Sequence, residues 1–183
     1  MAGKNILGLV GGISKGSLNK KLFHAVQKLS PPGVTLESFD ISTLPFFSQD
    51  LENDPPAEVI DLKNKIKNAD AVLIVTPEYN HSVPGVLKNA IDWASRPPGK
   101  GVWEKKWVGI MGASAGNGGT YGAQQHLRAV LSQLDTRTMR KPEFLMNGSK
   151  SFDEKGDLID TKSEEFIKKY WTAFSAWITS EEK

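Results

Sequence analysis

The 183-residue chain contains no cysteine. This absence excludes disulfide bonds, thiolate catalysis and zinc sites built on cysteine. Long apolar runs are missing as well. The apolar stretch near the start, Ile6 to Val10, is too short and too rich in glycine for a signal peptide, and no span approaches membrane length. The sequence therefore predicts a cytoplasmic protein that does not bind a membrane.

An excess of charge of one sign is also absent. The formal net charge is +2, and the basic residues are scattered apart from the pairs Lys105–Lys106 and Lys168–Lys169. Nucleic-acid binding requires a basic patch, so we expect no nucleic-acid partner. The three histidines, His24, His81 and His126, lie far apart without the spacing of metal ligands, so we expect no metal site.

The remaining composition is that of an ordinary globular protein. Hydrophobic residues make up 39% of the chain and charged residues 24%. The length is sufficient to bury a core, and no linker, repeat or low-complexity segment divides the sequence. We therefore expect one domain over residues 1–183.

Short apolar runs alternate with helical patterns along the chain. Strands are predicted at residues 6–10, 34–39, 72–75 and 107–111, with a fifth within 138–146. Helices are predicted at residues 17–29, 56–69, 84–94, after 122, and at 163–178. Such alternation with short connections indicates parallel strands and right-handed crossovers. The pattern predicts an α/β protein: a flavodoxin-like, three-layer, doubly wound sheet of five parallel strands.

The first of three distinctive loops is GGISKGSLN, Gly11 to Asn19, between the first strand and the first helix. Backbone N–H groups at a helix start, together with the helix dipole, bind anions. The glycines allow a tight turn, Ser17 can cap the helix, Asn19 can donate its amide, and Lys15 supplies a nearby cation. The loop therefore indicates a phosphate site, with a plain strand-to-helix turn as the alternative.

This loop does not match the two common nucleotide motifs. Gly11 and Gly16 have the spacing of a Walker A motif, but Ser17 stands where that motif requires lysine. Gly-x-Gly-x-x-Gly is not matched either. The sequence thus argues against a nucleoside triphosphate site and against a Rossmann dinucleotide site.

The second loop lies in TPEYNHSVPGVLKNAIDW, residues 76–93. Pro77 and Pro84 restrict the backbone between them, so the loop is stiff. A stiff loop presents backbone N–H groups at fixed positions. Asn80 can hydrogen-bond a ring or brace the loop, and Tyr79 can stack on a ring or cover it. Together the two loops predict a flavin mononucleotide (FMN) site at the carboxyl edge of the sheet.

The third loop is rich in glycine and runs from Gly112 to Gly122. It can lie flat beside a ring system, or it can be a flexible loop. Asn117 and Tyr121 either meet a nicotinamide substrate or face solvent. Ser114 and Ser17 have no paired base and acid, so a hydrolase triad is not supported.

These motifs carry a resemblance to a known family. LIVTPEYNHSVPGVLKNAIDWASRP resembles the signature of the NADPH-dependent FMN reductases, which include bacterial chromate and quinone reductases, and VGGISKGSLN resembles their phosphate loop, usually G-S-x-R-x-x-S-x-N. The resemblance implies phosphate contacts from Ser17, Asn19 and the surrounding backbone of Gly11, Ser14, Lys15, Gly16 and Leu18. It implies ring and ribityl contacts from Pro77, Glu78, Tyr79 and Asn80, and a further contact from Ser114.

The chain departs from the family pattern at two positions. Gly12 stands in place of the usual serine, and Ser14 in place of the usual arginine. Arginine binds phosphate through two parallel hydrogen bonds, so its loss predicts weaker FMN retention unless Lys15 substitutes.

The implied activity is that of an FMN-dependent NAD(P)H oxidoreductase. Hydride passes from NADPH or NADH to the flavin and then, in a ping-pong cycle, to a small-molecule electron acceptor such as a quinone, azo dye, chromate or free flavin. No side chain is required as an acid or base. The resemblance also implies a homodimer or homotetramer, with which exposed aromatic residues at Phe46, Phe47 and Trp103 are compatible.

Two other functions fit the same fold. A flavodoxin-type electron carrier binds FMN without oxidising nicotinamides, but such carriers are commonly acidic, unlike this chain. A cofactor-free interaction module is supported only by the departures at Gly12 and Ser14. The physiological acceptor and the choice between NADH and NADPH stay open at this point.

Overall fold

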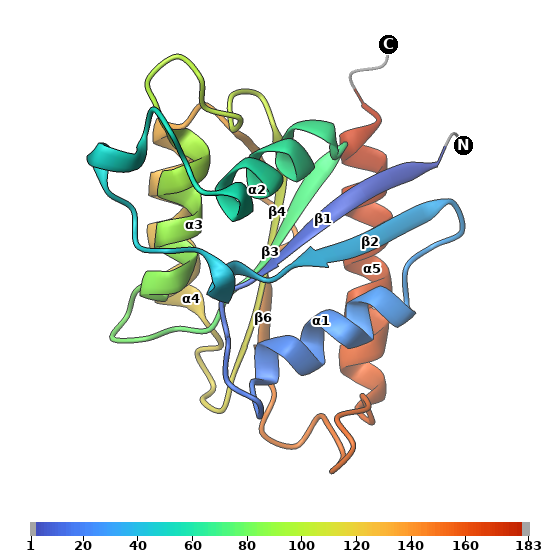
Figure 1. Cartoon of the computed structure of the whole chain (residues 1–183). Coiled ribbons are helices and arrows are strands. Elements are labelled where there is room, and N and C mark those ends of the chain that lie inside the picture. Colours follow the sequence, from blue (N-terminus) through green and yellow to red (C-terminus); the bar gives the residue numbers. More distant parts are fainter. Residues whose placement is uncertain (1–2, 181–183) are drawn as a thin grey trace.

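A computed structural model, which describes residues 3–180, has a parallel β-sheet between two layers of helices (Figure 1). The strands are β1 Lys4–Val10, β2 Val34–Phe39, β3 Ala71–Val75, β4 Trp107–Ser114, β5 Arg137–Thr138 and β6 Phe144–Asn147. Their order is β2-β1-β3-β4-β5, with β6 also paired to β4, and every pairing is parallel. The predicted flavodoxin-like architecture is thereby confirmed.

The fifth position of the sheet is divided between two short strands. β5 pairs with the beginning of β4, where Arg137 lies opposite Trp107, and β6 pairs with its end, where Phe144 lies opposite Met111. The residues between them include Pro142, which has no N–H group to donate to a ladder. The single strand expected within residues 138–146 is therefore interrupted.

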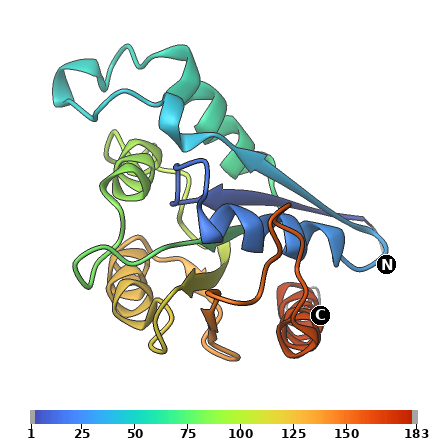
Figure 2. The same cartoon turned by 90° about the horizontal axis from the view of Figure 1, so that it is seen from below.

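Five helices cover the sheet: α1 Leu18–Lys28, α2 Ala57–Asn68, α3 Gly85–Ser95, α4 Tyr121–Gln133 and α5 Thr161–Ile178. α1 and α5 pack on one face, and α2, α3 and α4 pack on the other (Figure 2). All five residues of β3 are buried, and they alternate between the two core clusters. This explains why its sequence, AVLIV, is apolar throughout.

β4 is longer than expected and includes the first three residues of the predicted third loop. Gly112 belongs to the strand, and a Cβ atom there would lie 1.8 Å from Oγ1 of Thr120 and 2.6 Å from the carbonyl oxygen of Thr76. The glycine thus permits close packing rather than a turn. The third loop begins only after Ser114, and α4 follows from Tyr121.

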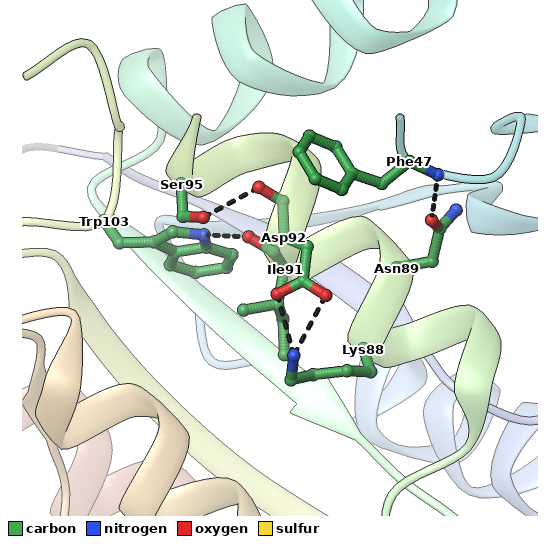
Figure 3. A network of polar contacts seen from close by, with 7 residues as sticks. All are labelled: Phe47, Lys88, Asn89, Ile91, Asp92, Ser95 and Trp103. Carbon is green, nitrogen blue, oxygen red and sulfur yellow. Dashed lines mark hydrogen bonds and ion pairs between the residues drawn. The ribbon is translucent and has the colours of Figure 1, made fainter. Parts of the chain in front are cut away.

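The long segment between β2 and α2 extends outward from the sheet (Figure 2). It contains two short 3₁₀ turns, Ile41–Thr43 and Gln49–Leu51. α3 holds it. Asn89 accepts a hydrogen bond from the N–H of Phe47 at 2.8 Å (Figure 3). Trp93 donates to the carbonyl of Pro45 at 2.8 Å. Asn89 and Trp93 therefore attach this segment to α3.

Trp103 is not exposed, contrary to expectation. Its side chain is 1% exposed, and the indole N–H donates to the carbonyl of Ile91 in α3 at 3.1 Å (Figure 3). Phe47 is half-buried against Trp93, with ring centroids 5.0 Å apart. Of the three aromatic residues proposed as exposed, only Phe46, at 88% exposure, is largely open to solvent. No helix within residues 3–180 is long and apolar enough to cross a membrane.

Candidate functional site

The three loops singled out in the sequence follow β1, β3 and β4, so they meet at the carboxyl edge of the sheet. Backbone bonds connect them laterally. The N–H of Gly11 donates to the carbonyl of Val75 at 2.9 Å, and the N–H of Thr76 donates to that of Met111 at 3.0 Å. This edge lies at the topological switch point between β1 and β3, where ligands bind in such sheets.

The first loop leaves a group of backbone donors without acceptors. The N–H groups of residues 12–16, and those of Leu18 and Asn19, donate to no acceptor in the described part of the chain. Ser17 begins α1 as its N-cap, with a φ of −58° and a ψ of 121°, and its Oγ accepts from the N–H of Lys20. Unpaired N–H groups at the start of a helix form an anion site.

The side chains of this loop divide into exposed and buried ones. Ser14, Lys15 and Gly16 are exposed, and Lys15 has no charged partner among residues 3–180. Lys20, one turn into α1, adds a second cation, because its Nζ donates to the carbonyl of Ile13 at 2.8 Å. Lys20 was not predicted from the sequence, although its position three residues after the cap places it in the first turn of α1, near the predicted anion site.

Two glycines allow the chain to pack closely under the loop. A Cβ on Gly12 would lie 2.1 Å from Oγ of Ser17, so this hydroxyl occupies the space beside residue 12. A Cβ on Gly11 would lie 3.2–3.3 Å from atoms of Pro77, Pro84 and Leu87. The first loop therefore rests directly against the second.

Asn19 serves the protein rather than facing outward. Its side chain is 2% exposed, donates to the carbonyl of Ala113 at 2.9 Å and accepts from the N–H of Ala113 at 3.0 Å. The amide that was expected to donate to phosphate is thus engaged with β4. Leu18 is half-buried, packs against the core on this face of the sheet and lies beside Gly148, so only its backbone takes part in the loop.

The second loop forms a tight turn from Tyr79 to Ser82. These two residues exchange backbone hydrogen bonds of 3.0 Å in both directions. Asn80 and His81 between them have positive φ values, 50° and 60°. The side chain of Asn80 and the N–H groups of Glu78, Asn80 and His81 have no partner within residues 3–180. Pro77 is buried, whereas Tyr79 is 53% exposed.

The carboxylate of Glu78 points to α4 and not to the open edge. Its Oε2 accepts from the N–H of Ala123 at 2.9 Å, and its Oε1 lies 3.1 Å from Nδ1 of His81. A carboxylate in the first turn of a helix satisfies a free N–H and interacts favourably with the dipole. Glu78 can therefore contact a ligand only through its backbone.

The third loop is more ordered than its glycine content suggested. Oγ of Ser114 donates to the carbonyl of Gly116 at 3.1 Å and accepts from its N–H at 3.2 Å. Asn117 accepts from the side chain of Asn147 at 3.0 Å. Tyr121 is 54% exposed beside the second loop's anchor on α4. Ser114 and Tyr121 thus lie at the expected edge.

A cavity of about 690 Å³ lies elsewhere. It is lined by Leu29, Pro31, Val34, Trp171 and neighbouring residues, at the amino-terminal ends of β1 and β2. Since the loops described above follow the opposite ends of the strands, this cavity is separate from the candidate site. Among residues 3–180 there is no cluster of histidine and carboxylate side chains that could hold a metal ion.

Comparison with known proteins supplies the family. Residues 4–151 match the model of the NADPH-dependent FMN reductases. The chain belongs to this family. Membership makes it an oxidoreductase with FMN as cofactor and NAD(P)H as co-substrate.

The relatives of this FMN reductase are similar over nearly their whole length. A 2-hydroxy-1,4-benzoquinone reductase from Burkholderia sp is 42% identical over 171 residues, 93% of each chain. An NAD(P)H-dependent FMN reductase from Pseudomonas aeruginosa is 43% identical over 176 residues, 94% of each chain. The solved structure of FerB, a flavoenzyme NAD(P)H:(acceptor) oxidoreductase from Paracoccus denitrificans, matches with a TM-score of 0.91 and 38% identity, covering 97% of this chain and 98% of that one.

The observed loops fit an FMN molecule chemically. The phosphate group of FMN requires hydrogen-bond donors, and the first loop offers unpaired N–H groups with Lys15 and Lys20 nearby. The flat flavin ring of FMN requires hydrogen-bond donors at fixed positions, and the turn at Asn80 offers unpaired backbone N–H groups.

Sequence reasoning about this FMN reductase missed the way the second loop is supported. Ser82 and His126 share a hydrogen bond of 2.8 Å although they are 44 residues apart. No local pattern signals such a pair. His24, in contrast, is an exposed residue of α1, and its ring meets that of its neighbour Phe23 edge-on.

Proposed function

We propose that this FMN reductase binds FMN across the first two loops and passes electrons to a quinone. The observation that carries the proposal is the juxtaposition of unpaired backbone donors in both loops at one sheet edge. Neither set of donors has a partner in the described residues, although each loop is fixed by other backbone bonds, Gly11 to Val75 in the first and Tyr79 with Ser82 in the second. Backbone N–H groups left unpaired in an ordered loop call for a ligand or water.

The phosphate would be bound by the first loop. The N–H groups of residues 12–16 and of Leu18 would donate to its oxygens, with the hydroxyl of Ser17 and the ammonium groups of Lys15 and Lys20 close by. Gly11 contributes by allowing contact with Pro77, and Asn19 by joining α1 to β4.

The ring and ribityl chain would be bound by the second and third loops. Donors on the second loop are the N–H groups of Glu78 and Asn80 and the side chain of Asn80, and Pro77 fixes the entry to the turn. Tyr79 limits access to the ring from solvent, and Ser114 closes the site from β4.

The chemistry of hydride transfer is supplied by FMN when it is bound. The chain's own part is to orient the ring, to exclude water and to direct backbone donors at the atoms where negative charge develops. No side chain of the site is needed as a general acid or base in this proposal. The nicotinamide and the acceptor would use the open face in turn, which suits the exposure of Tyr79 and Tyr121.

A quinone is the acceptor class best supported by the relatives. The Burkholderia relative is named a 2-hydroxy-1,4-benzoquinone reductase, and relatives from Pseudomonas putida and Escherichia coli, 37% and 38% identical, are named quinone reductases. Azo dyes, chromate and free flavin are alternative acceptors to be compared in the same assay.

We further propose that residues 1–183 form one domain and that the protein is cytoplasmic. Two or four copies would assemble as a homodimer or homotetramer. Phe46, 88% exposed on the segment between β2 and α2, offers an apolar contact for a second copy. Sedimentation with and without the Phe46→Ser substitution tests whether that segment contributes to assembly.

The deciding experiment is FMN titration of the purified protein, followed by anaerobic addition of NADPH and then of a benzoquinone. We expect tight binding, rapid bleaching of the flavin spectrum by NADPH, and recovery of the spectrum on quinone addition. Binding without bleaching would indicate an electron carrier instead. Absence of FMN binding would contradict the proposal and favour a cofactor-free module.

A further inference from the structure

The turn from Tyr79 to Ser82 has a conformation that its own sequence does not secure. Positive φ values at both central residues are those of a type I′ turn, which favours Asn-Gly. Asn80 and His81 are both residue types found at positive φ more often than most, but His81 stands at the second central position, where a type I′ turn prefers glycine. A turn of this kind needs support from outside if it is to hold one shape.

That support comes from one side of α4. Before the turn, Glu78 accepts the N–H of Ala123 at 2.9 Å, and at its end Ser82 shares a hydrogen bond of 2.8 Å with Nδ1 of His126. Ala123 and His126 are three residues apart, so they lie on the same side of the helix. Both legs of the turn are therefore attached to the same surface.

The bond between Ser82 and His126 is available in both protonation states of the imidazole. A serine hydroxyl can donate to an unprotonated Nδ1 and accept from a protonated one. The other ionisable groups near the turn are Glu78 and His81, which pair with each other at 3.1 Å, and the phenols of Tyr79 and Tyr121. The attachment thus serves as a permanent support.

We propose that His126 is a positioning residue for the flavin ring: through Ser82 it holds the turn at Asn80 in the orientation that the ring requires. The inference rests on the proposed function, because the ring is the group that the turn would present its donors to. His126 touches neither the ring nor a substrate in this arrangement and acts only through Ser82.

Removing the bond should free one leg of the turn while Glu78 holds the other. The donors at Asn80 would then sample several orientations, and the ring would lose part of its alignment. Loss of one neutral hydrogen bond of this type changes an equilibrium by roughly fivefold. The expected effect is on FMN affinity and not on the fold, because His126 is exposed and lies outside the core.

The test is a double-mutant cycle on FMN affinity, measured by titration of the apoprotein. His126→Ala and Ser82→Ala should each weaken binding by roughly fivefold, and the double variant should be no weaker than either single one. His126→Asn places an amide at the position of Nδ1 and should restore binding to within about twofold of the parent. His24→Ala, the same substitution at an exposed histidine on α1, should leave binding unchanged. Additive losses, or parental affinity in His126→Ala, would overturn the proposal.

Hydrogen exchange of the apoprotein gives a second readout. The N–H groups of Tyr79 and Ser82, paired with each other's carbonyls, should exchange faster in His126→Ala while the melting temperature stays close to that of the parent. Unchanged exchange, or a large loss of melting temperature, would show that His126 does not act on the turn. A parent protein that fails to bind FMN would instead refute the proposed function, and this inference with it.

Discussion

Asn19 and Asn80 stand in neighbouring loops at the same sheet edge, yet they have opposite surroundings. Asn19 is 2% exposed, and its side chain hydrogen-bonds both backbone groups of Ala113. Asn80 is exposed, and its side chain has no partner within residues 3–180. One asparagine holds the site together, and the other is free to bind a ligand.

The two loops differ in the same way. The turn of the first is shaped by local features, since the cap at Ser17 and the glycines lie within a few residues of each other, and Asn19 then ties it to β4. The second is held by α4, through bonds that span 45 and 44 residues. The difference shows that one binding site can be built partly from local sequence signals and partly from long-range contacts.

The largest expected effect comes from replacing Asn19 by leucine. The substitution leaves the N–H and carbonyl of Ala113 buried without partners, so the free energy of unfolding should fall by about 3 kcal/mol. FMN affinity should fall as well, because α1 is no longer tied to β4. Urea denaturation of the apoprotein measures the first effect. Asn19→Asp keeps only the acceptor oxygen, so its free energy of unfolding should lie between those of the parent and of Asn19→Leu. If Asn19→Leu is as stable as the parent, the structural role of Asn19 is contradicted.

Restoring the family's arginine in the first loop tests whether the anion site there is weakened by its loss. Ser14 stands where the family usually has arginine and is exposed. Ser14→Arg should tighten FMN binding by about tenfold at low salt, since a guanidinium forms charge-assisted bonds with phosphate. The gain should shrink at high ionic strength. Ser14→Gln is the neutral control. An affinity that does not change would mean that Ser14 lies away from the phosphate.

Asn80→Gly isolates the contribution of a side chain in the second loop. Glycine accepts the φ of 50° without strain, so the turn and the stability of the apoprotein should be preserved. FMN affinity should fall by roughly fivefold, the effect of one lost hydrogen bond. Asn80→Val, which is strained at this φ, should reduce stability too. If Asn80→Gly binds FMN like the parent, the side chain of Asn80 is not a ligand and the contrast with Asn19 disappears.

The same contrast explains how far the sequence could be read. The parallel sheet with alternating helices was predicted from apolar runs within short windows, and the anion site of the first loop was predicted from glycine spacing and a serine before a helical pattern. Trp103 was misjudged because its polar neighbours in the sequence suggested exposure, whereas α3 buries it. The fifth strand is divided because β5 pairs with the beginning of β4 and β6 with its end, and such pairing has no signal within a short window of sequence.

The role of Glu78 shows the same limit within the site. Its place in the family motif implied a contact with the cofactor, but its carboxylate caps α4 at Ala123. The motif identifies residues that matter for the loop without distinguishing those that bind from those that hold. Only the fold, by bringing α4 beside the turn, separates the two roles.

The smallest effect is expected beside the first loop, at Asp40. Hydrogen bonds from Ser42, and to a lesser extent the charge of Lys20, hold the pKa of Asp40 below its ordinary value of 3.8. A carboxyl whose pKa is lower in the folded state stabilises the fold above the unfolded value and loses this contribution as the pH falls through the folded value. Asp40→Asn should therefore cost only a few tenths of a kcal/mol at pH 7, because the group is largely solvated.

Measured by urea denaturation, the difference between Asp40→Asn and the parent should shrink as the pH falls below 3.8 and through the lower pKa that the carboxyl has in the folded parent. FMN affinity at pH 7 should be unchanged, because Asp40 bonds to Ser42 and not to residues 11–19. A weaker FMN complex would mean that the first loop depends on β2 through the Asp40–Lys20 charge pair. The first loop would then depend on the segment after β2 as well as on β4, to which Asn19 ties it, and local features would explain less of its shape.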